Sequence, residues 1–290
     1  MQALSFYLTL PFIYLLSILP FGVLYAISDF GFFILYYLIK YRRKVVMENM
    51  KNSFPQKSVK ELQELEKKFY RYLCDLIVEN IKSVTISKAQ ALARCKILDL
   101  TLFEKLYAEN KNIILVLGHY GNWEWAATSF SLQTNYQLNV IYRPLSNSNF
   151  DRFMYKVRGR FGSKLIAMND IYKEMLKSKN HLSATAFVAD QTPSPEKAYW
   201  TNFLEQSTPI FWGTEKIARK LNYPIVFGSV NRIKRGYYEI STQILFDQPN
   251  KTATGAISES HTRHLEQEIR KQPEIWLWSH RRWKHKRKIS

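Results

Sequence analysis

The side chains best suited to chemistry lie in the stretch "LGHYGNWEW" (Leu117–Trp125), which follows the apolar run "NIILV". His119 and Glu124 stand five positions apart in it, on either side of a Gly-Asn pair. A continuous helix would separate them, because neighbours on one helix face are three or four residues apart. A buried strand ending at His119, a tight turn and a helix beginning near Glu124 would bring them together. The spacing therefore predicts a strand–turn–helix.

Such a pair could act as a general base. A carboxylate that holds one ring nitrogen of a histidine fixes the tautomer and leaves the other nitrogen free to take a proton. Because no protein nucleophile stands beside the pair, we expect His119 to activate a hydroxyl of the substrate, with Glu124 as its orienting partner. The alternative is a core histidine capped by a carboxylate, against which the strand-end position and the flanking Trp123 and Trp125 argue. No second His or Cys lies nearby at ligand spacing, so we expect no metal.

Strand patterns and helix patterns alternate around this motif, which indicates an α/β layered domain. The expected strands are Asn112–Leu117, Leu138–Tyr142, Ser183–Ala189, Pro224–Val230 and Tyr237–Phe246, and the expected helices are Trp123–Phe130, Asn149–Arg160, Glu215–Leu221 and Gly255–Lys271. Before them, apolar residues at three- and four-residue steps predict a long amphipathic helix over Lys57–Ser83 and a shorter one near Ala89–Ala93.

The N-terminus predicts a membrane anchor. Between Ala3 and Ile39 the only charged residue is Asp29. Leu4–Ile27 exceeds the roughly 20 apolar residues that a bilayer span needs, and it lacks the basic start and cleavage site of a signal peptide. We expect an interfacial helix at Phe30–Ile39. The basic cluster Lys40–Lys44 then places the rest of the chain on the cytoplasmic side.

Composition restricts the partners. The chain of 290 residues has a formal net charge of +18, which suits nucleic acid, an anionic lipid surface or an acidic protein. The two cysteines, Cys74 and Cys95, show no ligand spacing and are expected to be reduced thiols.

Several segments resemble the bacterial lipid A biosynthesis acyltransferases, the late lauroyl/myristoyl family, which belong with the wider glycerolipid acyltransferases. "GHYGNWEW" resembles their H-x-x-x-x-E signature. Four further blocks agree in order over nearly the whole chain: "YRRKVVMENMKNSFP", "VIYRPLSNSNFDRFMYKVRGRFG", "VADQT" and "WLWSHRRWK".

The resemblance implies a mixed sheet flanked by helices, with an N-terminal transmembrane helix. It divides the chain into an anchor with an interfacial helix (1–40), a juxtamembrane helical segment (41–98) and an α/β acyltransferase domain (99–290). It also implies acyl transfer from acyl carrier protein or coenzyme A to a hydroxyl of a lipid A precursor at the inner membrane. No cofactor beyond that acyl donor is expected. The acidic carrier protein and the phosphates of the anionic lipid acceptor both suit a basic chain.

Four further residues are candidates for substrate binding. Arg143 follows a strand and would meet an anionic group or the developing oxyanion, unless it is simply solvated. Arg160 is a second candidate, although Arg158 and Arg160 are two positions apart and at most one need point inward. Asp190 and Gln191 end another strand. Asp190 either caps the turn or supports the catalytic pocket, and Gln191 would bond the donor or acceptor.

The tail Trp278–Lys288 mixes tryptophans with six Lys and Arg residues, which suits a lipid headgroup surface. The same composition suits single-stranded nucleic acid, but no recognition motif accompanies it, so we expect no nucleic-acid partner. Two alternatives stay open. One is a non-enzymatic adapter that binds through this tail, and the other is a related enzyme that acylates another lipid, such as an aminolipid, a glycolipid or a pigment precursor.

Overall fold

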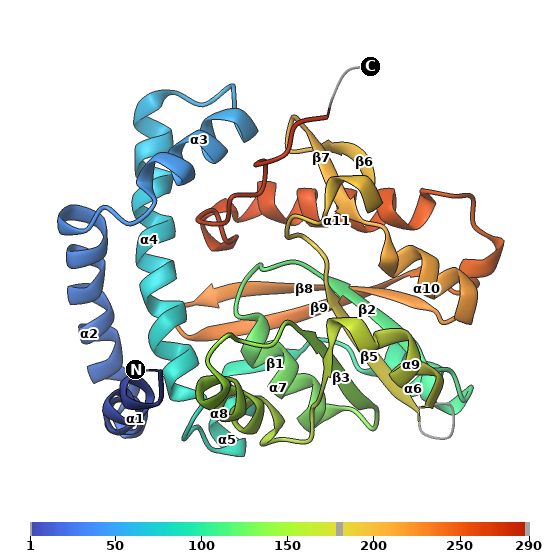
Figure 1. Ribbon diagram of the computed structural model, residues 1–290, viewed down its shortest axis with the longest axis horizontal. Coiled ribbons are helices and arrows are strands. Elements are labelled where there is room, and N and C mark those ends of the chain that lie inside the picture. The colour runs from blue at the N-terminus through green and yellow to red at the C-terminus, as the bar shows by residue number, and fades with distance from the viewer. Residues whose placement is uncertain (1, 178–181, 288–290) are drawn as a thin grey trace.

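Seven strands pair into one mostly parallel sheet in the computed structural model, which describes residues 2–177 and 182–287 (Figure 1). Across the sheet the order is β1 (Cys95–Ile97), β9 (Tyr237–Phe246), β8 (Ile225–Lys234), β2 (Ile113–Leu117), β5 (Ser183–Val188), β3 (Gln137–Tyr142) and β4 (Lys164–Ala167). β8 and β9 form the antiparallel pair, and β6 (Ala198–Phe203) and β7 (Gln206–Phe211) form a separate antiparallel ribbon. The predicted α/β class is confirmed.

The central strand β2 is buried on both sides, as a strand covered by two helical layers must be. Its alternate residues Ile114 and Val116 join one core cluster, and Ile113 and Leu115 join the other. In Figure 1, α10 and α11 lie above the sheet, and α7 and α8 lie below it. The helices of this domain are α5 (Lys88–Arg94), α6 (Thr101–Ala108), α7 (Trp123–Gln133), α8 (Ser148–Gly159), α9 (Ile171–Lys177), α10 (Gly213–Leu221) and α11 (Ala256–Lys271).

The N-terminal helices have other bounds than expected. The chain forms α1 (Gln2–Ile18) and α2 (Phe21–Phe33), and α2 continues into a π-helical turn, Ile34–Leu38. The break falls inside the expected span because Pro20 has no N–H and restricts the residue before it. Lys82 stabilises the break between α1 and α2, because its ammonium donates to the carbonyl oxygens of Ser17 and Leu19, each at 2.9 Å. The stretch that is long and apolar enough to cross a membrane is therefore Phe21–Leu38.

The predicted amphipathic helix is confirmed as α4 (Val59–Lys82), which begins with a capping box between Ser58 and Glu61. Helix α2 runs along α4 (Figure 1) and is held to it by polar bonds, such as the 2.6 Å bond from Ser28 to Asp75. Between them in sequence lies α3 (Arg43–Ser53).

The expectation of a headgroup surface in the C-terminal tail is wrong for its central residues. Trp278 and Arg282 are 0% exposed, and Asn49 of α3 donates to the carbonyl oxygen of Trp278 at 2.9 Å. Trp278 and Arg282 therefore pack into the domain, whereas Arg281, Lys284, Lys286 and Arg287 are exposed and Lys288 lies outside the described residues. The chain also forms short 3₁₀ turns at Met168–Asp170, Pro195–Lys197, Pro249–Lys251 and Pro273–Ile275.

Candidate active site

His119 and Asp190 meet because they follow neighbouring parallel strands. β2 and β5 are paired in register, and the backbone N–H of Ala189 still donates to the carbonyl of Leu117 at 3.0 Å. Just beyond, His119 Nδ1 lies 2.6 Å from Asp190 Oδ1, and the backbone N–H of His119 donates to Asp190 Oδ2 at 2.8 Å. The indole N–H of Trp276 donates to the same Oδ2 at 2.7 Å. Asp190 therefore joins two strand ends and the C-terminal segment.

The electrostatics of this pair fix the tautomer of His119. Burial raises the pKa of Asp190, but the charge and hydrogen bonds of His119 and the indole N–H of Trp276 outweigh it and lower the pKa to about 2. Asp190 is therefore ionised at neutral pH and can only accept at Oδ1, so Nδ1 carries the proton. Nε2 is then the basic nitrogen, and it lies 3.2 Å from the side-chain amide of Gln191.

The turn after His119 is built from two residues of the motif. Gly121 has φ +61°, and a Cβ there would stand 2.0 Å from the carbonyl oxygen of Val230, so a side chain is excluded. Asn122 caps α7 by accepting from the N–H of Trp125 at 3.0 Å, and its amide donates to the buried Glu79 at 2.8 Å. The strand–turn–helix predicted from the spacing is confirmed.

Glu124 does not orient His119, because Asp190 holds the ring nitrogen that was expected to meet it. Glu124 points instead toward α8 and forms a bidentate ion pair with Arg158, whose Nε and Nη2 donate to the carboxylate at 2.9 Å and 2.5 Å. The expected contact between Glu124 and the imidazole is therefore wrong. Glu124, in the first turn of α7, pairs with Arg158 of α8 instead.

Arg158 in the last turn of α8 and Arg160, the residue that follows the helix, point in different directions, as their spacing predicts. Arg158 lines the same cavity as His119, whereas Arg160 turns away and donates to the carbonyls of Ser83 at 2.6 Å and Ile86 at 3.2 Å. The structure thus places Arg158, and not the expected Arg160, beside the reactive group. Arg143 also lines this cavity.

This cavity, which we call the main cavity, has a volume of about 610 Å³ and lies between the carboxyl ends of the strands, α7 and α8. Its inner wall is formed by the buried side chains of Phe103, Phe130 and Leu138. Its outer rim carries Leu145 and Met168, which are 50% and 46% exposed. A single apolar space therefore leads from the surface past His119 into the domain, within the size range of small-ligand sites.

The polar and charged side chains that line the main cavity include His119, Glu124, Arg143, Arg158 and Gln191. Among residues 2–177 and 182–287, no cluster of three or more His, Cys, Asp or Glu side chains that would hold a metal ion is present. The arrangement suits base chemistry on a polar group next to a bound hydrocarbon chain.

The sequence does not single out Trp276 as a site residue, and it favours Arg160 over Arg158. The tail around Trp276 reads "EIWLWSH", an apolar segment that could have indicated burial before the basic run. The side chain of Arg158 is fixed by a carboxylate 34 residues away, which no local pattern shows.

The α/β fold, the histidine held by Asp190 and the apolar cavity suit acyl transfer. A family model described as bacterial lipid A biosynthesis acyltransferase matches residues 1–285. A protein of Haemophilus influenzae named lipid A biosynthesis acyltransferase is 23% identical over 245 residues, which cover 82% of this chain and 74% of that protein. The chain belongs to the bacterial lipid A biosynthesis acyltransferase family.

Proposed function

We propose that the protein transfers a fatty acyl chain from acyl carrier protein, or from coenzyme A, to a hydroxyl of a lipid A precursor. The observation that carries this proposal is the position of His119. Its basic Nε2 is set by Asp190 and faces a cavity whose interior is apolar. A base at the mouth of a hydrocarbon-binding space is what acyl transfer to a lipid hydroxyl requires.

The reaction follows from this geometry. The acceptor hydroxyl lies against His119 Nε2, which takes its proton as the oxygen attacks the thioester carbonyl carbon. The imidazolium that forms is stabilised by Asp190 through Nδ1. The tetrahedral oxyanion then collapses, the carbon–sulfur bond breaks, and the thiolate takes the proton from the imidazolium. The products are the ester and the free thiol, and His119 is neutral again.

The polar groups at the cavity mouth supply the remaining roles. Glu124 holds Arg158 through the edge formed by Nε and Nη2, so Arg158 presents a fixed positive charge at the cavity. Arg158 and Arg143 would bind the phosphates of the acceptor or the donor. The amide of Gln191 already lies at hydrogen-bond distance from Nε2, so it marks the place where the reacting oxygens would sit.

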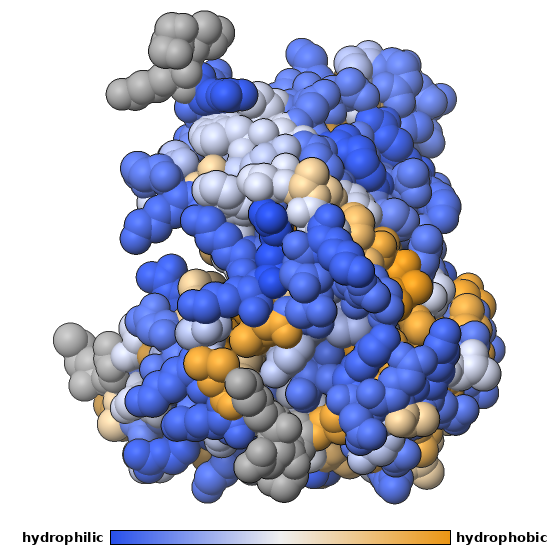
Figure 2. Space-filling model, turned by 90° about the vertical axis from the view of Figure 1, so that its right-hand side faces the viewer, coloured by the Kyte–Doolittle hydropathy of each residue, from blue (hydrophilic) through white to orange (hydrophobic). Residues whose placement is uncertain are grey.

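The surface of the molecule supports a membrane location. The helix α1 exposes large apolar side chains, among them Leu4, Leu8, Phe12 and Leu15, whose exposed fractions lie between 58% and 66%. The face opposite α2 is mostly hydrophilic, with separate apolar patches in its lower half (Figure 2). An enzyme anchored on one side to the cytoplasmic face of the inner membrane would meet its lipid acceptor there, and an acidic carrier protein would approach the basic chain from the cytosol.

Part of the tail is unavailable to a non-enzymatic adapter. That alternative relied on an exposed aromatic and basic surface, but Trp278 and Arg282 have no exposed area, whereas Arg281, Lys284, Lys286 and Arg287 are exposed. Acylation of another lipid would use the same base and differs from our proposal in the acceptor alone.

Replacement of the proposed base tests this function. We expect His119→Ala to lower acyl transfer by a factor of about 10³ or more, since general-base catalysis contributes about 10² to 10⁴ and positioning adds to it. His285→Ala, outside the main cavity, serves as the control and should retain transfer. Membranes that contain each variant would be incubated with a lipid A precursor and with acyl carrier protein that bears a labelled acyl chain. Transfer at the wild-type rate by His119→Ala would contradict the proposal, and lipid mass spectrometry of a deletion strain would identify the acceptor and the chain length.

A further inference from the structure

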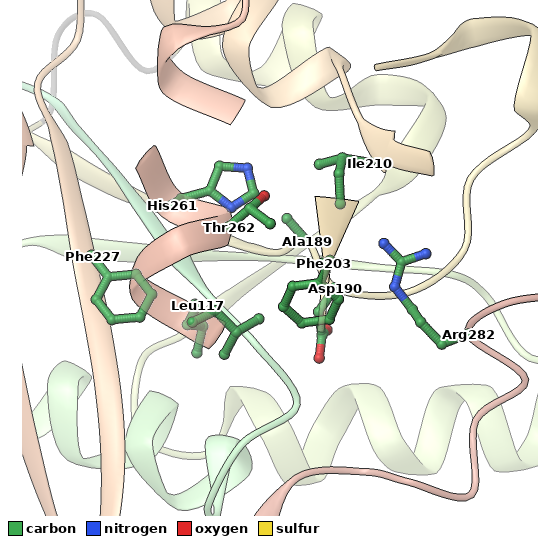
Figure 3. Close-up of a pocket in the computed structure, with 10 residues that line it drawn as sticks. Leu117, Ala189, Asp190, Phe203, Ile210, Phe227, His261, Thr262 and Arg282 are labelled. Carbon is green, nitrogen blue, oxygen red and sulfur yellow. The ribbon is translucent and has the colours of Figure 1, made fainter. Parts of the chain in front are cut away.

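Behind the catalytic pair lies a second, much smaller cavity of about 10 Å³. Its polar lining comes from Asp190, His261, Thr262 and Arg282, and the remainder is apolar: Leu117, Ala189, Phe203, Ile210, Phe227 and Leu265. Figure 3 shows His261 and Arg282 on opposite sides of this space, with Asp190 between them. A space of this volume is large enough for about one water molecule, provided that polar groups line it.

Arg282 is a buried cation that lacks enough partners. Its side chain is 0% exposed, and Nη2 donates to the carbonyl oxygen of Pro209 at 2.7 Å. Nε and Nη1 have no hydrogen-bond partner within the described part of the chain. Burial lowers the pKa of Arg282 to about 10, and the charge of Asp190 opposes this effect, so the guanidinium stays protonated at neutral pH. A buried charge in this position needs a counter-charge, because burial removes it from water.

His261 supplies the third polar group. It lies on α11 and is 5% exposed, and its Nε2 is also unpartnered among the residues that the structure describes. Burial lowers its pKa to about 4, so the ring is neutral at physiological pH and offers one donor and one acceptor.

Asp190 has one acceptor site left for this cluster. An ionised carboxylate offers about four lone-pair sites. Three are used by the ring and backbone N–H groups of His119 and by the indole of Trp276. No hydrogen bond within the described part of the chain uses the fourth, and Asp190 lines the small cavity.

We infer that Arg282 is a positioning residue for Asp190. Its guanidinium binds one water molecule in the small cavity, and this water also bonds to His261 and to the remaining lone pair of Asp190. The inference rests on the proposed function, because its effect is exerted through His119.

The chemical reason lies in how Asp190 divides its charge. A carboxylate beside an imidazole favours the imidazolium, which cannot act as a base. A second cation that draws on the same carboxylate weakens this preference. The titratable groups around Asp190 are His119, His261, His280 and Arg282. Burial lowers the pKa of His280 to about 4, so Arg282 supplies the permanent charge.

The test is the pH profile of kcat/KM for Arg282→Met and Arg282→Lys in the full chain. We expect Arg282→Met to move the acidic limb upward by about one pH unit, which lowers the rate about tenfold at pH 6 but no more than about twofold at pH 9. Arg282→Lys, which keeps a cation, should move the limb back toward its wild-type position. A loss by the same factor at every pH would indicate a merely structural role and overturn the inference.

Two controls separate the possible failures. If His119→Ala kept its activity, the proposed function itself would fail, whereas an inactive His119→Ala with an unmoved limb in Arg282→Met would refute this inference alone. A crystal structure of the wild-type protein that resolves ordered waters does not depend on whether the variants fold. It should show a water within hydrogen-bond distance of Arg282, His261 and Asp190, and a guanidinium bonded elsewhere with no such water would also overturn the inference.

Discussion

Substitution of Asp190 by Asn should abolish catalysis through the tautomer of His119. Asp190 Oδ2 accepts from two fixed donors, the backbone N–H of His119 at 2.8 Å and the indole N–H of Trp276 at 2.7 Å. The amide oxygen of the new side chain must take this place, because an NH₂ group there would face both donors. The NH₂ group therefore occupies the Oδ1 place, 2.6 Å from Nδ1, and donates to it.

An imidazole that accepts at Nδ1 carries its proton on Nε2, and Nε2 can then no longer act as a base. The expected loss in kcat is a factor of about 10³ to 10⁴, which corresponds to about 4 to 5.5 kcal/mol of transition-state stabilisation. KM should change little, because Asp190 does not line the main cavity. Raising the pH should not restore activity, since the tautomer is set by the amide.

The assay would measure kcat and KM of the detergent-solubilised enzyme with an acyl carrier protein donor. Glu124→Gln is the matched comparison, because it makes the same change in a carboxylate that contacts Arg158 and not His119. We expect it to cost about tenfold. The reasoning would be refuted if Asp190→Asn lost less than tenfold, or if Glu124→Gln were the more damaging substitution.

Three further predictions concern the main cavity and its support. A Cβ at Gly228 would meet nothing within 4 Å, and the residue lines the cavity, so Gly228→Val should shorten the preferred acyl chain by about two carbons. At about 0.8 kcal/mol per excluded methylene, kcat/KM for the original chain should fall on the order of tenfold, and an unchanged preference over a donor series would contradict this. Arg158→Lys loses the bidentate hydrogen bond to Glu124 and should lower kcat/KM about tenfold. Arg160→Lys, at the C-cap of the same helix, should lower kcat/KM less than about twofold. Equal effects of the two substitutions would contradict the placement of these arginines. Burial raises the pKa of Glu79 to about 7 despite opposing hydrogen bonds, so the folded state binds the extra proton and loses stability as pH rises from about 4.5 to 7. Thermal unfolding should show that the free energy of unfolding falls by an amount on the order of 3 kcal/mol between pH 5 and pH 8, and that Glu79→Gln reduces this fall. The same pH dependence in both proteins would contradict the role of Glu79.

Local patterns predicted the elements around the site, because hydrophobic periodicity and turn residues act over short distances. The strand before His119, the turn at Gly121 and the helix after it follow from the consecutive residues Asn112–Trp125. The short elements escaped this method, among them the edge strands β1 and β4, the β6–β7 ribbon and the helices α3, α6 and α9.

The partner of His119 could not be found by spacing. Asp190 is 71 positions away and reaches the histidine because β5 pairs with β2, which is a property of the sheet order and not of either segment. Glu124, the carboxylate nearby in sequence, contacts an arginine of α8 instead. The C-terminal segment was predicted to be exposed because it is rich in basic residues, although Trp276 and Arg282 in it are buried.

The most direct test is a crystal structure of the protein with a non-hydrolysable acyl-thioester analogue. The account predicts that the acyl chain lies in the main cavity against Phe103 and Phe130, with the carbonyl group beside His119 and Nε2 facing the space where an acceptor hydroxyl would bind. An acyl chain bound elsewhere, or an imidazole whose Nε2 is turned away from the carbonyl and whose Nδ1 has left Asp190, would contradict it.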